Sequence, residues 1–447
     1  MPTITGVIFF CCGAYCFLCK EESLLGLLII SSVFEASSAI NVAERGIQPY
    51  YLVAGFIIAR ALVNRALGFR SNKLLPYRSW LLVFGVVAVA SAAVSPFIFA
   101  GIRVYDPKIG IDDGLFIRPP LQFGFNNVIQ AGYLAWHIAT AFALLAIKFS
   151  AAKARRAYLW AFYIEVCFIS AESICQLVGI NFPLWLVLNN PGYSLWENSQ
   201  EAYGTRNPGT FAEPSLAGAF LVVYCIGFFA EYLAGKGRVI KVVMAMLASG
   251  LVASSSSIAT LCLVPVGLLY RYSPFRFPWY INLRQMRKIV WIMILLAGPL
   301  VVAVLFSSGY REVITTLTVS KGESGSFINR TASDLYGLQL LLETHGLGVG
   351  LGSSRSSGLV TTLLSNIGIV GTVSFGVFYF KLFTNLPEDY AWLMWGATAL
   401  FVNMCIGLAD VTMPIFWIPM FLAICFSSDK MQGRQKLSGS NSSLVVI

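Results

Sequence analysis

The chain has 447 residues, of which 57% are hydrophobic and only 12% are charged, and its formal net charge is +10. A soluble domain carries roughly 25% charged residues, so this composition excludes a large soluble domain. The basic surplus is expected to face the anionic lipid of a cytoplasmic leaflet, and no nucleic-acid partner is expected.

Long apolar runs follow one another along the chain. A helix needs about 20 apolar residues to cross a bilayer, and backbone in lipid must satisfy its own hydrogen bonds. The sequence therefore predicts an all-α polytopic membrane protein with about thirteen transmembrane helices, or twelve if 241–254 and 256–271 form one kinked helix. The predicted spans are 4–19, 24–42, 50–67, 80–100, 126–147, 158–180, 210–233, 241–254, 256–271, 289–306, 359–380, 391–409 and 412–427.

Lysine and arginine are unequally divided between the connecting segments. Short segments after alternate spans are strongly basic, whereas the longer ones between them carry mixed charge. Because short cytoplasmic loops collect basic residues, we expect the long loops 101–125, 181–208 and 307–358 to lie outside the cytoplasm. Residues 1–427 then form a single transmembrane domain, and 428–447 form a disordered cytoplasmic tail.

The ten cysteines all lie within apolar runs. Cys16 and Cys19 fit the C-x-x-C pattern, but no second ligand pair or histidine accompanies them. Buried cysteine behaves as a small hydrophobe, so neither a metal site, a cofactor nor a disulfide framework is expected.

The first segment that suggests chemistry is 203–222, YGTRNPGTFAEPSLAGAFLV. Arg206 is the only basic residue of its loop and lies just ahead of a predicted span. Pro214 predicts the first turn of that helix, with Glu213 at its cap. A purely structural interpretation is also open, because Glu213 could compensate the helix dipole and Arg206 could reach lipid headgroups.

The second segment is 327–371. Its part from 331 to 343 has apolar residues at helical spacing and predicts a short interfacial helix within the large outer loop. Glycine then occupies every second position from 346 to 352. Backbone amides of such a stretch can approach a phosphate closely, and Gly348 and Gly350 are the predicted contacts, although alternating glycine also marks close packing.

Arginines accompany both segments. Arg330 and Arg355 flank the glycines, as Arg206 precedes the earlier span. Guanidinium groups bind phosphate oxygens bidentately, so three loop arginines suit a diphosphate such as that of a polyprenyl-diphosphate sugar. Glu213 is the predicted general base for an acceptor hydroxyl, and His345 is the alternative.

These segments resemble a known family. The stretch R-x-x-G-T-F-x-E-P-S at 206–215 is similar to a segment of Wzy-type exopolysaccharide and O-antigen polymerases, within the O-antigen ligase/polymerase superfamily. So are Arg330, the run H-G-L-G-V-G-L-G-S-S-R at 345–355 and N-I-G-I-V-G at 366–371. The span count and the large outer loop before the last three spans fit the family over nearly the whole chain.

The resemblance implies a GT-C-like enzyme of the bacterial inner membrane. It implies that undecaprenyl-diphosphate-linked oligosaccharides are polymerised at the periplasmic face by metal-independent, inverting glycosyl transfer. It also implies that membrane lipid, a flippase and a chain-length regulator of the same pathway are partners. Arg206, Arg330 and Arg355 would bind the diphosphate.

Two rival functions stay open. The ligase branch carries a His-Asn pair where this chain has Ser357-Gly358, which favours a polymerase. His345 stands where family members often have proline, which weakens its claim to catalysis. A lipid-linked oligosaccharide flippase or other transporter would place charge inside the bundle and keep its outer loops short.

Several charged residues do fall inside predicted spans. Glu35 and Arg60 are expected at similar depth on adjacent spans, as a structural ion pair. Glu165 and Glu172, seven residues apart, share one helix face that should point to protein or a water-filled cavity. His137 is expected to be packed and hydrogen-bonded.

Overall fold

The computed structural model describes residues 1–42, 45–69, 75–105, 117–180, 182–192, 207–252, 254–272, 322 and 325–441, and the statements below concern these residues. They form 13 α-helices and one short hairpin, an all-α architecture as the sequence predicts. The helices are α1 (Ile4–Cys19), α2 (Leu24–Ser31), α3 (Pro49–Ala66), α4 (Arg78–Ile98), α6 (Phe125–Leu145), α7 (Ala151–Leu177), α9 (Pro214–Leu233), α10 (Val239–Val252), α11 (Ser255–Tyr272), α14 (Gly325–Glu343), α15 (Leu359–Thr384), α16 (Ala391–Gly407) and α17 (Pro414–Asn441). The hairpin pairs β1 (Ile40–Val42) with β2 (Arg45–Ile47) antiparallel.

The helices α4, α6, α7, α9, α15 and α16 with its preceding turn are long and apolar enough to cross a membrane. Four shorter apolar helices, α1, α10, α11 and the first half of α17, accompany them. The chain is therefore a multi-pass helical membrane protein. Helices overlap twelve of the thirteen predicted spans, and the remaining span, 289–306, lies outside the described residues.

The predicted span 24–42 is wrong as a continuous helix, because α2 ends after eight residues. The hydroxyl groups of Ser31 and Ser32 donate to the carbonyl oxygens of Leu28 and Ile29, both at 2.8 Å, which competes with helix propagation. The chain then continues without helix to Ala39, beside the start of α1. Membrane proteins tolerate irregular backbone where protein surrounds it, and this stretch is almost entirely buried.

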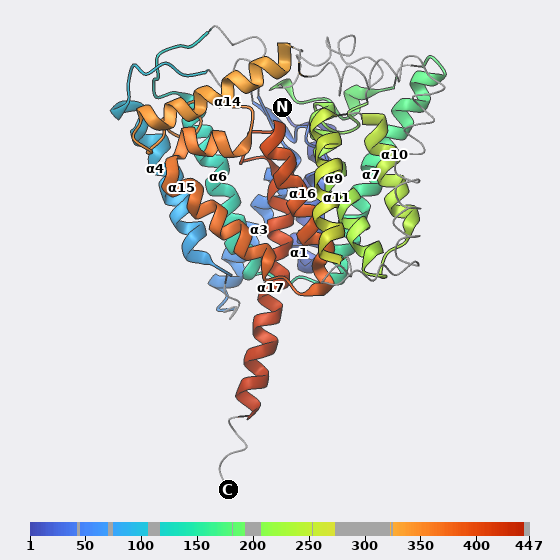
Figure 1. Cartoon of the computed structure of the whole chain (residues 1–447). Coiled ribbons are helices and arrows are strands. Elements are labelled where there is room, and N and C mark those ends of the chain that lie inside the picture. Colours follow the sequence, from blue (N-terminus) through green and yellow to red (C-terminus); the bar gives the residue numbers. More distant parts are fainter. Residues whose placement is uncertain are drawn as a thin grey trace, which may run out of the picture.

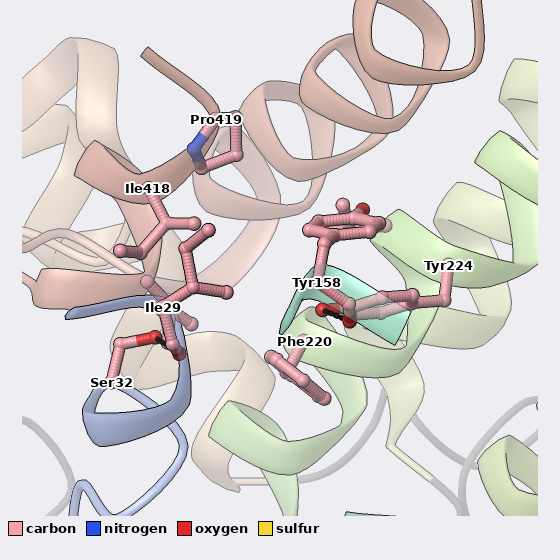
Figure 2. Close-up of a pocket in the computed structure, with 9 residues that line it drawn as sticks. Ile29, Ser32, Tyr158, Phe220, Tyr224, Ile418 and Pro419 are labelled. Carbon is pink, nitrogen blue, oxygen red and sulfur yellow. Dashed lines mark hydrogen bonds between the residues drawn. The ribbon is translucent and has the colours of Figure 1, made fainter. Parts of the chain in front are cut away.

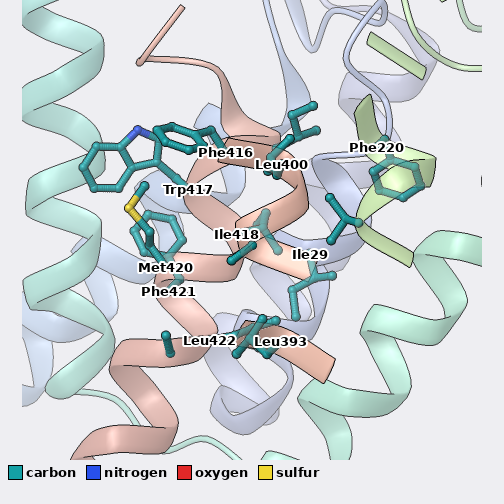
Figure 3. Close-up of a cluster of buried hydrophobic side chains, with 14 of the residues drawn as sticks. Ile29, Phe220, Leu393, Leu400, Phe416, Trp417, Ile418, Met420, Phe421 and Leu422 are labelled. Carbon is teal, nitrogen blue, oxygen red and sulfur yellow. The ribbon is translucent and has the colours of Figure 1, made fainter. Parts of the chain in front are cut away.

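A large apolar core joins α9, α16 and α17. Apolar residues cover α9 on all sides, and 83% of its spanning window is buried, as expected of a helix at the centre of a bundle. Figure 3 shows Ile418 of α17 between Ile29 of α2 and the aromatic side chains of α17, with Phe220 of α9 nearby. Trp417 is fully buried in this core.

One end of the bundle is covered by α14, which lies at the opposite end from the last turns of α17 (Figure 1). We call this end the α14 face. The other end carries basic residues such as Arg65, Arg78 and Lys381, and we call it the basic end. The predicted interfacial helix is confirmed as a helix and begins earlier than expected, at Gly325. Leu340 packs into a small cluster with Val104 and Leu121, whereas Leu335 and Leu342 are 64% and 76% exposed, as an interfacial helix requires.

Candidate functional site

The segment 207–213, which leads into α9, is held inside the bundle by carboxyl groups. Glu165 of α7 is fully buried, and its Oε2 accepts hydrogen bonds from Thr210 N at 3.1 Å and Thr210 Oγ1 at 2.6 Å. The same hydroxyl lies 2.6 Å from Val33 O, beyond the end of α2. Thr210 thus connects α7 to the irregular stretch after α2.

Two further buried glutamates bind the same segment. Glu172 Oε2 accepts from Gly209 N at 3.3 Å, and Glu35 Oε2 accepts from Ala212 N at 3.1 Å. Gly209 has φ +60°, and a Cβ there would lie 2.4 Å from Glu165 Oε1, so glycine is required. The prediction that Glu165 and Glu172 share one face, toward protein or a water-filled cavity, is confirmed, and protein is what they contact.

The predicted ion pair between Glu35 and Arg60 is wrong. Arg60 Nη2 instead lies 3.1 Å from Glu21 Oε2 at the basic end, and Glu35 Oε1 accepts from Gln48 Nε2 at 3.3 Å. Since α2 stops at Ser31, Glu35 belongs to the irregular stretch that approaches the α14 face. The two residues are therefore at different depths.

Glu213 is the N-cap residue of α9, as Pro214 predicts. Its side chain is half-buried, and Oε2 accepts from Ser215 Oγ at 2.7 Å. The backbone amides of the preceding segment donate to the buried glutamates, so the position of Glu213 follows from theirs. Arg206, predicted to act beside it, lies outside the described residues.

Arg330 reaches from α14 to the end of α16. Its Nη1 lies 3.1 Å from the position that a Cβ on Gly407 would take, at the end of α16. Gly407 in turn lies against Ser256 at the start of α11, and the neighbouring Ser257 packs on Gly218 of α9. The half-buried Arg330 and the N-terminus of α9 are thereby linked by a continuous series of contacts.

Arg355 is exposed on the connection between α14 and α15, and its backbone N donates to Tyr105 O at 3.3 Å. This connection is tied to α14 by Asp334. The carboxylate Oδ1 of Asp334 accepts from the amides of Ser357 at 2.8 Å and Gly358 at 3.0 Å, at the N-terminus of α15. Sequence analysis missed Asp334, because a cap supplied by another helix leaves no local pattern.

His345 terminates α14. It is exposed and has φ +53°, the left-handed conformation that helix C-termini commonly adopt. Gly346 N donates to Leu341 O at 2.8 Å and His345 N donates to Leu342 O at 3.0 Å, the paired bonds of a Schellman cap. The cap accounts for the place of His345, and within the described part of the chain His345 has no contact with Glu213 or Arg330.

The two glycines predicted to contact phosphate pack the connection against α15. Gly350 N donates to Asn366 O at 2.8 Å, beside a kink of α15 where Gly368 has φ +71°. Gly348 N donates to Thr344 Oγ1 at 3.0 Å, and a Cβ on Gly348 would lie 2.6 Å from Asn366 O. Both amides are therefore engaged within the protein, and the alternative interpretation as close packing describes them.

His137 lies in the core as expected. Its Nδ1 is 2.8 Å from Tyr50 Oη, its Nε2 is 2.7 Å from Thr412 O, and its ring stacks on Trp417 at 4.9 Å between centroids. Both ring nitrogens have partners, so the histidine has a structural role here.

An internal cavity of about 20 Å³ lies beneath the site between α2, α7, α9 and α17 (Figure 2). That volume suits about one water molecule, so neither a sugar nor a lipid chain fits. Among the described residues, no group of three or more His, Cys, Asp and Glu side chains could hold a metal ion.

No known protein family matches the chain, and no curated protein matches it. The resemblance to polysaccharide polymerases therefore rests on the motifs at 206–215 and 345–371.

Proposed function

We propose that the chain is a membrane-embedded polysaccharide polymerase that joins polyprenyl-diphosphate-linked oligosaccharide repeats. The observation that carries the proposal is the position of Glu213. Glu213 is the N-cap residue of a deeply buried helix at the α14 face, behind a segment that buried carboxyl groups hold in place, and Arg330 of α14 reaches the end of α16, which packs along the same helix. A base and a cation on one face are what transfer from a diphosphate requires.

In the proposed reaction, an acceptor hydroxyl attacks the anomeric carbon of the donor sugar. A new glycosidic C–O bond forms with inversion as the C–O bond to the diphosphate breaks. Glu213 takes the proton of the hydroxyl, and Arg330 and Arg355, with Arg206, stabilise the charge that develops on the leaving diphosphate. No metal is needed for this step, since the arginines supply the positive charge.

The placement of basic residues supports an outward orientation of the α14 face. At the opposite end, basic residues occupy the end of α3, the starts of α4 and α7, the turn before α10, the start of α10 and the end of α15. They are Arg65, Arg78, Lys153, Arg155, Arg156, Lys236, Arg238, Lys241 and Lys381. By the positive-inside tendency the basic end faces the cytoplasm, and we infer a bacterial inner membrane.

The rival functions fit the geometry less well. A transporter would use charged groups inside the bundle to line a path, but Glu165 and Glu172 bind the backbone of 207–213 instead. A ligase would need its histidine at the position of Ser357. That residue is buried here, and its amide donates to Asp334.

The test is complementation of a bacterial strain that lacks the gene, with lipid-linked saccharides separated on gels and weighed by mass spectrometry. Glu213→Gln and Arg330→Ala should each insert normally yet accumulate single lipid-linked repeats, with polymer formation reduced roughly 100- to 1000-fold. Arg103→Ala, which removes an exposed arginine of the same face, is the matched control and should make normal polymer.

Three results would overturn the proposal. Normal chain length in Glu213→Gln would remove the proposed base. Long polymer that stays on its carrier in the deletion strain would indicate a ligase. Repeats that accumulate only on the cytoplasmic side would indicate a transporter.

A further inference from the structure

A groove of about 350 Å³ opens between α1, α2 and α7 near the basic end, away from the α14 face. Apolar atoms make up nearly all of its surface. Residues of all three helices line it, among them Tyr15, Gly26, Lys153, Arg156, Ala157 and Trp160.

The groove exists because α1 packs on α3 and not on α7. A Cβ on Gly13 would lie 2.5 Å from the ring of Phe56, so α1 approaches α3 closely at that point. On the other side, small residues bring α2 against α7, where the position of a Cβ on Gly26 is 3.2 Å from Ala157 Cβ. The gap between α1 and α7 is therefore apolar. Residues of α2 form its base, and its other side opens to the surrounding membrane.

The first turns of α7 place positive charge at one end of the groove. Arg155 turns inward and forms an ion pair with Glu231 of α9. Arg156 is exposed, and among the described residues no acidic side chain pairs with it. Lys153, one turn earlier on the same face, pairs with Glu22 at 2.8 Å, but both side chains are about half exposed and such pairs contribute little.

We infer that this groove binds one anionic phospholipid. An acyl chain would lie along Gly26 and Ala157, and the phosphate would be bound by Arg156 and Lys153. Guanidinium and ammonium groups both bind phosphate oxygens, and a tryptophan such as Trp160 is typical of the headgroup level of a membrane. Lys153 and Trp160 are seven residues apart, about 10 Å along the helix, which a small part of an acyl chain spans. A lipid here also removes the void that the apolar walls would otherwise leave.

The inference can be tested on the purified full-length protein in phosphatidylcholine bilayers that contain dibrominated lipid, which quenches tryptophan fluorescence at close range. The signal of Trp160 is the difference between wild type and Trp160→Phe. Brominated phosphatidylglycerol should quench this signal at a lower mole fraction than brominated phosphatidylcholine does. Arg156→Gln should weaken that preference roughly fivefold, the effect of about one basic residue near a membrane surface.

The matched control is Arg78→Gln, which removes an exposed basic residue at the start of α4, at the same end of the bundle. It should keep the preference. Cys12→Phe, which fills the groove without changing charge, should reduce quenching by both lipids. Equal quenching by the two lipids in wild type, or an equal loss in Arg78→Gln, would overturn the inference. So would a Trp160 signal that neither lipid quenches, since another molecule would then cover the groove.

Discussion

Thr210 is the residue on which the buried part of the candidate site depends most. Its amide and hydroxyl bind Glu165, its hydroxyl lies beside Val33 O, and its carbonyl oxygen accepts from Ala36 N at 3.2 Å. The side chain and backbone of one residue therefore join α7, the stretch after α2 and the segment that leads to Glu213. A buried polar group that loses its partner is costly, so this residue should be sensitive to substitution.

We expect Thr210→Val to lower the free energy of unfolding by about 1–3 kcal/mol, because buried oxygen atoms of Glu165 and Val33 lose their hydroxyl partner. The measurement is the thermal unfolding midpoint in detergent. Thr384→Val is the control, since the hydroxyl of this exposed residue bonds only within α15, to Phe380 O. It should change stability by less than about 0.5 kcal/mol. Equal effects of the two variants would contradict the role assigned to Thr210.

A second expectation concerns His345, which carries a side chain in the left-handed conformation at the end of α14. His345→Gly should raise the free energy of unfolding by about 1 kcal/mol, because glycine adopts this conformation without the steric cost. Polymer formation should be unchanged. Loss of polymer in a variant that is more heat-stable than wild type would instead give His345 a catalytic role.

Among the elements, α14 is the one whose attachment decides the shape of the α14 face. On one side, Tyr336 Oη donates to Arg103 O at 2.6 Å, and the guanidinium carbon of Arg118 lies 4.2 Å from the Tyr336 ring centroid. On the other side, Asp334 caps the start of α15 and also accepts from Thr361 Oγ1 at 2.8 Å. The helix therefore connects the loop after α4 with α15.

Asp334→Ala should release α14 from α15 and cost about 0.5–2 kcal/mol, the range for loss of a helix cap. Hydrogen exchange followed by mass spectrometry should show faster exchange at the start of α15 and across 344–358. Glu343→Ala is the comparison on the same helix, since the Glu343 carboxylate bonds only to Gln339 among the described residues. If both variants exchange alike, Asp334 does not fasten the helix.

The sequence was informative about elements wherever a local signal existed. Pro214 predicts the start of α9, and the serine run from 254 predicts the break that separates α10 from α11. The irregular stretch after α2 could not be predicted, because its residues are apolar enough for a span. Its non-helical conformation depends on partners far along the chain, such as Asn189, whose Oδ1 accepts from Ser38 N at 2.7 Å.

The same reason limits prediction of the site. Glu213 as a helix cap follows from its neighbour in sequence, whereas the contact of Glu35 with Ala212 joins residues 177 apart. A glutamate within an apolar run needs a partner, and Arg60 is the nearest basic residue that the predicted spans place beside Glu35. Nothing in one sequence identifies a backbone amide as the partner instead.

For the molecule as a whole, the basic end is held together at Glu21. Its carboxylate accepts from Arg60 and Asn64 of α3 and from Lys148 N, just before α7. Burial acts to raise the pKa of Glu21, but these hydrogen bonds and the charge of Arg60 outweigh it and hold the pKa below its usual value of 4.5. The carboxylate therefore stabilises the fold in its ionised form.

The sign of the pH dependence follows from that lowered pKa. The contribution of Glu21 is fully present above pH 4.5 and is lost as the pH falls through the lower value of the folded state. At neutral pH, Glu21→Gln should be less stable than wild type by about 1 kcal/mol, and the gap should close in acid. Thermal unfolding between neutral and acid pH measures it. Glu22→Gln, which loses only an exposed pair, should follow wild type throughout, and a gap that widens in acid would refute the assignment.

The short α2 also has a consequence for biosynthesis. The backbone beyond it is satisfied by residues synthesised much later, since Val33 O finds the Thr210 hydroxyl 177 residues further on. At about 5–20 residues per second, the ribosome needs roughly 9–35 s to make that partner. During this interval the nascent N-terminal third has unpaired polar backbone that lipid cannot satisfy. It must be sheltered by the insertion machinery or remain near water, so the packing of α2 and the stretch after it is completed only after the segment around Thr210 has been inserted.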